Sequence, residues 1–331
     1  MPKKSLRYIV LDCETATLPF VSAIANGDSE IKKKIAIARP LIYDLGWVIT
    51  NRKGEILKKA NYLIAEIFSV PSVFNTAYYA DKRPIYLEML NHGEITIKPW
   101  NDVINEFIQD AENVDGIGAF NSMFDFKKAI PFTDLYISKL YSPDYYRWEK
   151  AQYTLCEHIA FDKKKESDNN FEPDVFRFHN KVYPLFDIWG LATIHLLNTV
   201  NYKSTCIKND YFTNSGVYFK TSAEVTYRYL QDKYNFIEAH TALDDAIIET
   251  YILSRIAARH AITMGIKYFP FRDLGTTIDF CKRKKKVDID ECHKVIDKIN
   301  EYIDSKEDEG ISNYIQMLIT KIAELEELMG I

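Results

Sequence analysis

Two carboxylates at the end of a predicted strand are the first residues in the chain that could bind a divalent cation. Asp12 and Glu14 follow the apolar run at residues 7–11. Side chains at positions i and i+2 of a strand share one face, so both carboxylates should point the same way. They would repel each other unless a cation or solvent lies between them. A D-x-E pair is common in proteins, however, so this pair alone does not define a metal site.

Two further acidic motifs lie far along the chain, each at the start of a predicted helix. Asp125 follows a strand predicted at residues 116–120, and Asp245 comes five residues after His240. Singly, each acid has a simpler interpretation, because a carboxylate in the first turn stabilises a helix through its dipole. His240 would then be a loop residue. The adjacent Asp244 is a second candidate for the acid of the last motif, although the spacing from His240 favours Asp245.

In this order, the three motifs resemble those of the DnaQ-like (DEDDh) 3′–5′ exonucleases. Residues 8–15 (Y-I-V-L-D-C-E-T) resemble the first motif of that family, and residues 121–125 resemble its N-x-x-F-D motif. Residues 240–246 match its H-x-A-x-x-D-A motif, whose histidine separates this subfamily from relatives with tyrosine. The resemblance covers residues 5–257 and leaves the C-terminal part of the chain outside it.

The resemblance implies phosphodiester hydrolysis assisted by two divalent cations, Mg²⁺ or Mn²⁺, which prefer oxygen ligands to thiolates. It assigns the metal ligands to Asp12, Glu14, Asp125 and Asp245. Asp12 would bridge both ions, Glu14 and Asp245 would hold the ion that activates water, and Asp125 would support the second ion. His240 would be the general base, because imidazole titrates near neutral pH.

The resemblance also assigns contacts with the substrate to five residues, which are Thr15, Ala16, Leu18, Asn121 and Phe124. The backbone of Thr15 and Ala16 would meet the terminal nucleotide, and Leu18 would wedge against the last base. Asn121 would help to hold the strand, and Phe124 would line the pocket. The alternative for Leu18 and Phe124 is packing in the core. Family members commonly have Thr-Gly where this chain has Ala-Thr after Thr15, so the contacts with the 3′ end are expected to differ.

Composition narrows the class of protein. The 331 residues include 47% apolar and 27% charged residues, which is typical of a folded globular chain. A net charge of −5 argues against a protein that coats nucleic acid through bulk charge. The 5 scattered cysteines favour neither a disulfide framework nor a structural zinc site. We expect a cytoplasmic protein, because the sequence shows neither a signal peptide nor an apolar run long enough for a membrane span.

The expected fold is α/β, with a ribonuclease-H-like mixed sheet flanked by helices and a helical C-terminal appendage. Strands are predicted at residues 41–50 and 54–65, and a helix is predicted at residues 100–111. The exonuclease domain is expected to span residues 1–265, with an irregular insert at about 131–181. Apolar residues at helical spacing predict that the appendage, residues 266–331, forms a helical hairpin.

The sequence thus predicts a metal-dependent 3′–5′ exonuclease that releases nucleoside 5′-monophosphates from single-stranded ends, with DNA as the expected substrate. A 3′–5′ exoribonuclease is the alternative within enzymes. A non-catalytic nucleic-acid-binding module that retains the fold is the alternative from another class, but such a module has no need of the acidic cluster. The expected partners are single-stranded DNA or RNA 3′ ends and a separate polymerase, with no membrane partner.

Overall fold

The computed structural model describes residues 6–161, 174–283, 288–306 and 312–330. Contacts divide the chain into two compact units. Unit 1 comprises residues 1–188 and 238–266, and unit 2 comprises residues 189–237 and 267–331. All three acidic motifs belong to unit 1.

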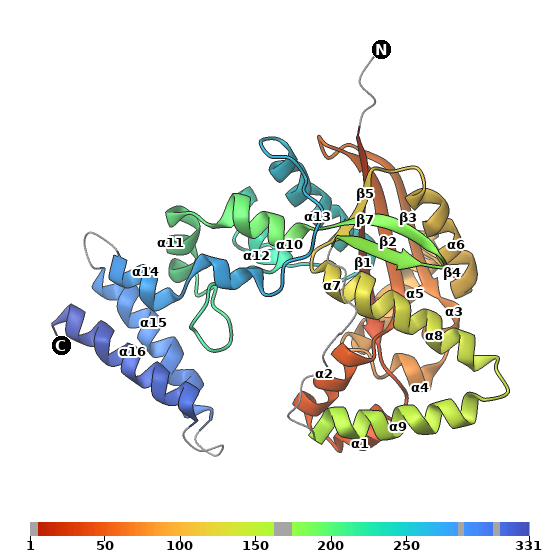
Figure 1. The fold of residues 1–331 in the computed structure, drawn as a ribbon, viewed down its shortest axis with the longest axis horizontal. Helices are drawn as coiled ribbons and strands as arrows, with labels where there is room; N and C mark the ends of the chain where they lie inside the picture. The colour runs from red at the N-terminus through yellow and green to blue at the C-terminus, as the bar shows by residue number, and fades with distance from the viewer. Residues whose placement is uncertain (1–5, 162–173, 284–287, 307–311, 331) are drawn as a thin grey trace, which may run out of the picture. The chain divides into compact units, whose positions relative to one another are not determined.

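Unit 1 is built on a seven-stranded mixed sheet with the strand order β4-β3-β2-β1-β5-β7-β6. β1, β2 and β3 are antiparallel neighbours, whereas β5 and β7 run parallel to β1 (Figure 1). Helices pack against this sheet, so the expected α/β class is confirmed. The strands are β1 (Arg7–Ala16), β2 (Leu41–Asn51), β3 (Ile56–Ile64), β4 (Thr96–Lys98), β5 (Gly116–Ala119), β6 (Val175–Phe178) and β7 (Lys181–Asp187).

One hairpin of the sheet and one flanking helix follow the sequence prediction. The strands expected at 41–50 and 54–65 are β2 and β3, which pair antiparallel across a tight turn. The expected helix at 100–111 is α6, where five of twelve residues are buried on one face. The helices of unit 1 are α1 (Val21–Ala25), α2 (Ser29–Ala38), α3 (Ala65–Phe68), α4 (Pro71–Phe74), α5 (Arg83–His92), α6 (Trp100–Ala111), α7 (Ser122–Phe124), α8 (Ile130–Leu140), α9 (Tyr145–Phe161) and α13 (Ala242–Ala257).

The two faces of the sheet pack against different helices. On one face, the Trp47 ring of β2 contacts the Phe107 ring of α6 edge-on, with centroids 5.6 Å apart. Leu11 of β1 pairs with Trp47, so it belongs to the same apolar face. Asp12 and Glu14 alternate with these residues and therefore point to the other face, where α13 packs on β1 and β2.

The prediction of an irregular insert at residues 131–181 is wrong for the part that the structure describes. This part contains α8, α9, β6 and the start of β7, while residues 162–173 lie outside the described residues. α9 buries Cys156 and Ala160, four residues apart on one face, and the Trp148 ring lies 5.9 Å from that of Tyr136. This apolar stripe is narrow and is surrounded by charged side chains, which hid the helical periodicity in the sequence.

Unit 2 is helical, and it includes residues 189–237, which lie before the boundary that we expected at residue 265. Tyr202 and Phe219 share one hydrophobic core with Ile278, Ile296 and Leu318, so residues 189–237 pack with the C-terminal helices. None of the helices in the described ranges is long and apolar enough to cross a lipid bilayer. The helices are α10 (Ile188–Ala192), which begins at the unit boundary, α11 (Val200–Lys208), α12 (Ala223–Gln231), α14 (Thr277–Arg283), α15 (Ile289–Asp304) and α16 (Asn313–Met329).

Candidate active site

The first two acids of the site lie near the end of β1. Asp12 is opposite Gly46 and Glu14 is opposite Asp44 on the antiparallel neighbour β2. Directly paired residues point to the same face of the sheet, so a third carboxylate joins the face that α13 covers. The register shifts immediately after Glu14, and this irregularity turns the following backbone away from the regular ladder.

Gly46 allows α13 to approach the acids on β1. A Cβ atom at this position would lie 2.3 Å from the backbone nitrogen of Leu243 in the first turn of α13. No side chain fits at that distance, because the neighbouring atoms are backbone and cannot rotate away. The glycine therefore sets the distance between the sheet and the helix that carries Asp245.

Gly46→Ala is expected to lower the stability of the protein, because the added methyl must push α13 away from β2. Overpacking of this kind costs about 1–3 kcal/mol of unfolding free energy. Urea unfolding would measure this effect. Gly116→Ala is the matched control, since its new Cβ would meet the flexible end of Met264 at 3.2 Å. Wild-type stability of Gly46→Ala would contradict this account of the close approach.

Asp44 holds the beginning of α13 in place. Its Oδ2 accepts hydrogen bonds of 2.9 Å from the backbone N–H of Ala242 and of 2.9 Å from the Tyr86 hydroxyl. The carboxylate of a neighbouring strand thus satisfies a free amide at the helix N-terminus. Burial raises the pKa of Asp44 to about 7, although both hydrogen bonds lower it. Sequence reasoning missed this residue, whose signal was a single acid within the apolar run at residues 41–50.

Asp125 lies where β5 passes into the helical segment of the second motif. Asn121 adopts the left-handed conformation (φ 76°), which asparagine tolerates better than most residues. Asp125 then begins a π-helical turn that extends to Ala129, an irregularity common at functional sites. The thiol of Cys13 donates a hydrogen bond of 3.1 Å to Asp125 Oδ1, which joins the second motif to β1.

Asp187 supports the second motif from the adjacent strand β7. Its Oδ1 accepts a hydrogen bond of 3.1 Å from the backbone N–H of Ser122. The Ser122 hydroxyl in turn donates to the carbonyl of Phe186 at 2.7 Å. Asp187 is the last residue of β7 and immediately precedes α10, and its carboxylate is bonded to the start of α7.

The third motif brings His240 and Asp245 next to Glu14. Ligand atoms of these three residues all lie within 4.8 Å of one another. The Nδ1 atom of His240 is 4.0 Å from Asp245 Oδ2 and 3.7 Å from Glu238 Oε2. Of the two adjacent acids, Asp245 is buried and belongs to this cluster, whereas Asp244 is exposed and accepts a hydrogen bond from Thr241.

Glu249 is a further acid of the site that sequence reasoning missed. It lies one turn after Asp245 on α13 and is 2% exposed. Its Oε2 accepts a hydrogen bond of 2.9 Å from the backbone N–H of Phe120, at the start of the second motif. Burial raises its pKa well above the usual value, and Asp125 and Asp245 raise it further. The signal in the sequence was an acid four residues after Asp245, on the same face of a strongly apolar helix.

The five residues expected to contact the substrate fall into two groups. Thr15, Asn121 and Phe124 are half-buried, and Phe124 also packs against the core of unit 1. Ala16 and Leu18 are each 1% exposed and pack in the core of unit 1. The expected wedge at Leu18 is therefore wrong for this conformation, because a side chain enclosed in the core offers no surface to a base.

The electrostatics of the site oppose the ionisation of its acids. Burial raises the pKa of Asp12 well above its usual value, and the charges of Glu249, Asp245, Asp125 and Glu14 raise it further. Burial is also the main cause of the raised pKa of Asp125, about 7, and of Asp245, about 8. The pKa of Glu14 is raised by burial and then by Asp245.

This donor set fits a hard divalent cation. Carboxylate oxygens and one imidazole converge, and Asp245 Oδ1 is buried without a hydrogen-bond partner among the described residues. A buried carboxylate oxygen without a donor is costly, and a cation would satisfy it. Oxygen-rich sites of this kind suit Mg²⁺ or Mn²⁺.

The raised pKa values predict that the metal-free protein is less stable at pH 8 than at pH 5.5. The folded state keeps Asp44, Asp125 and Asp245 protonated to about pH 7–8, whereas in the unfolded chain they ionise near pH 4. The folded state thus binds more protons between these limits, and its stability falls as pH rises through that window.

Thermal melting in EDTA would measure this effect, with an expected fall of about 5 °C or more between pH 5.5 and pH 8. Millimolar Mg²⁺ or Mn²⁺ should recover the loss at pH 8, because a cation that binds the folded state stabilises it. A melting temperature in EDTA that is constant or rises across this range would contradict the arrangement of acids.

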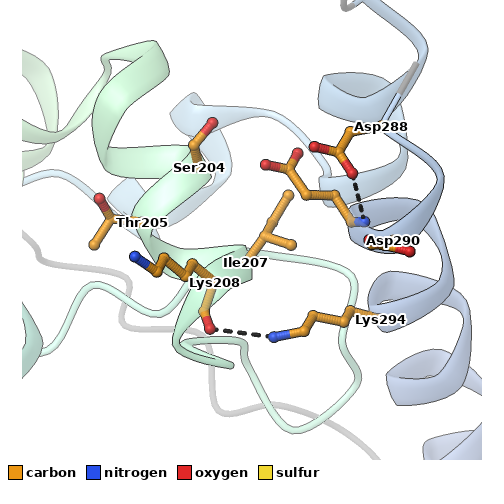
Figure 2. Close-up of a pocket in the computed structure, with 8 residues that line it drawn as sticks. Ser204, Thr205, Ile207, Lys208, Asp288, Asp290 and Lys294 are labelled. Carbon is orange, nitrogen blue, oxygen red and sulfur yellow. Dashed lines mark hydrogen bonds between the residues drawn. The ribbon is translucent and has the colours of Figure 1, made fainter.

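A separate hollow in unit 2, with a cavity volume of about 350 Å³, lies between α11 and the start of α15 (Figure 2). Both lysines and acids line this hollow, and their hydrogen bonds connect or cap its helices. Lys294 donates to the carbonyl of Lys208 at 3.2 Å, and Asp288 caps α15 by accepting from the backbone N–H of Glu291. The cluster of acids and histidine that the described residues form lies in unit 1, so we place the chemistry in unit 1.

Comparison with protein-family models, curated proteins and solved structures found no significant match for this chain.

Proposed function

We propose that this protein is a metal-dependent 3′–5′ exonuclease of the DnaQ-like (DEDDh) kind. It would hydrolyse single-stranded nucleic-acid ends, with DNA as the first expected substrate, to nucleoside 5′-monophosphates. Its substrates would be 3′ ends, and a separate polymerase would be the partner of a proofreading role. Unit 1 would be a ribonuclease-H-like domain, in which a central strand carries Asp12 and Glu14.

One observation carries this proposal. Three motifs that are more than a hundred residues apart in sequence meet around the end of β1, where Glu14 lies near His240 and Asp245 and where Cys13 donates a hydrogen bond to Asp125. Glu14, His240 and Asp245 share one cluster, while Asp12 interacts with the charges of Glu14, Asp125 and Asp245. A sheet that only needed stability would gain nothing from so many buried acids, since each costs free energy unless it is paired.

Different residues of the chain would have different roles in hydrolysis. Asp12, Glu14, Asp125 and Asp245 would hold the cations, and Asp44 and Glu249 would position the elements that carry them. Bound divalent cations supply Lewis acidity and shield the negative charge of the phosphate. His240 would accept the proton of the attacking water, since it lies beside Glu14 and Asp245 with its side chain 30% exposed.

The proposed function is tested by a gel assay on 5′-labelled single-stranded DNA and RNA of the same sequence. Reactions would contain Mg²⁺, Mn²⁺ or EDTA. A ladder that shortens from the 3′ end in metal and is absent in EDTA supports the exonuclease, and the preferred strand identifies the sugar. Absence of cleavage on both strands, with intact folded protein and either metal, would contradict the proposal.

A further inference from the structure

The segment from Tyr79 to Lys82 lies outside the three motifs but contacts their residues. The Tyr79 ring stacks on the imidazole of His240, with centroids 4.5 Å apart and planes at 16°. Lys82 ends a short 3₁₀ turn, and its ammonium lies 4.7 Å from the centroid of the Tyr79 ring. The same ammonium donates a hydrogen bond to the backbone carbonyl of Ala239, the residue before His240.

The charge of the site creates a difficulty for its proposed substrate. A phosphodiester is an anion, and it would have to approach Glu14, Asp245 and their acidic neighbours. Lys82 is the cation whose charge lowers the pKa of both Glu14 and Asp245, so its field reaches the acids directly. Lys82 is also half-buried, which weakens the screening of its charge by water.

We propose that the Tyr79–Lys82 segment is a fourth part of this active site. Lys82 binds the phosphate group of the nucleic-acid end, and Tyr79 positions the imidazole of His240. This inference deepens the proposed function and rests on it, since both roles concern the hydrolysis of a phosphodiester.

The contacts of Lys82 leave it able to bind an anion. An ammonium group has three N–H donors, and the hydrogen bond to the Ala239 carbonyl uses one of them. That bond also fixes the charge beside His240, so binding a phosphate would cost little additional side-chain entropy.

The stacking of Tyr79 explains how His240 keeps its orientation. His240 has a left-handed backbone (φ 53°) and lies in the segment that precedes α13. Tyr79 is half-buried and covers one face of the imidazole. We therefore describe Tyr79 as a positioning residue that acts through His240.

Binding measurements test the role of Lys82 without any need for turnover. Fluorescence anisotropy would follow a 5′-fluorescein oligothymidylate with a phosphorothioate 3′-terminal linkage, in calcium, over a range of KCl concentrations. Lys82→Ala should weaken binding about tenfold and reduce the slope of log K against log[salt] by about 0.7, the value for one phosphate contact on a single strand. Lys82→Arg should retain most of the binding.

Lys53→Ala is the matched control, because Lys53 is exposed in the β2–β3 turn. The end of β2 before this turn pairs with the start of β1, whereas Asp12 and Glu14 lie near the other end of β1. Thermal melts would show that each variant is folded. An unchanged affinity and salt slope in folded Lys82→Ala would overturn the role of Lys82. Cleavage by the wild type is measured separately, so failure of the exonuclease proposal is distinguishable from failure of this one.

Steady-state kinetics test the role of Tyr79. Tyr79→Ala should lower kcat about tenfold to a hundredfold with little change in KM, because a misplaced base slows the reaction without weakening binding. Tyr79→Phe keeps the stacked ring and should restore kcat to within about twofold of the wild type. A Phe variant as slow as the Ala variant, or an Ala variant with the wild-type kcat, would overturn the positioning role.

Discussion

Asp12→Asn is expected to abolish metal-dependent cleavage while it makes the metal-free protein more stable at pH 8. Asp12 is surrounded by the charges of Glu249, Asp245, Asp125 and Glu14, so a neutral side chain of the same shape removes repulsion. The same change removes a ligand from the proposed cation site. Cations contribute several kcal/mol of charge stabilisation, and about 1.4 kcal/mol is tenfold in rate, so we expect a loss of about 10³-fold or more.

Because Asp12→Asn should lower activity and raise stability, the variant distinguishes loss of the cation site from loss of the fold. Melting in EDTA at pH 8 would measure stability, and the rate of DNA cleavage in Mg²⁺ would measure activity. Asp144→Asn provides the control, because Asp144 is exposed in the turn before α9. A folded Asp12→Asn variant with wild-type cleavage would show that this carboxylate has no part in the chemistry.

His240→Ala is expected to lower turnover by about 10²–10⁴-fold, the usual contribution of a general base. The imidazole lies 4.0 Å from Asp245 and is accessible to solvent, which allows it to receive a proton beside the acids. Single-turnover cleavage in saturating Mg²⁺ would measure the chemical step. His158→Ala, on the exposed face of α9, is the matched control and should retain full activity. An unchanged rate for His240→Ala at neutral pH would remove His240 from the mechanism.

The expected acids of the site could be found from sequence because their types and spacing are local. Asp12 and Glu14 follow an apolar strand, and the spacing from His240 favoured Asp245, which the structure shows to be the buried acid of the pair. α6 was predictable for a similar reason, since its buried residues follow one helical stripe over its whole length.

The supporting residues of the site depend on contacts that no local pattern contains. Asp44 reaches the amide of Ala242, and Glu249 reaches the amide of Phe120, across 198 and 129 residues of sequence. Both are single acids within apolar segments, which is the one local signal they leave. Neither the stacking of Tyr79 on His240 nor the approach of α13 to Gly46 has any such signal, because each depends on where two distant segments meet.

The boundary between the two units also could not be predicted from local sequence patterns. We expected the boundary at residue 265, but the core of unit 2 combines Tyr202 and Phe219 with side chains of the C-terminal helices. A domain that is formed by two separate segments of the chain is defined by long-range packing, whereas composition describes only residues that are close together in sequence. Leu18 illustrates the same limit, since its motif position indicated a base contact and the fold encloses it in the core.

The most direct test of the central claim is the order in which mononucleotides are released from a marked oligonucleotide. The substrate would be a run of thymidylates with one deoxyadenosine at the 3′ end and one deoxyguanosine at the 5′ end. Chromatography of timed samples in Mg²⁺ should show deoxyadenosine 5′-monophosphate first, then thymidine 5′-monophosphate, with none of these products in EDTA or from Asp12→Asn. Release from the 5′ end first, nucleoside 3′-monophosphates as products, or equal release in EDTA would contradict the account.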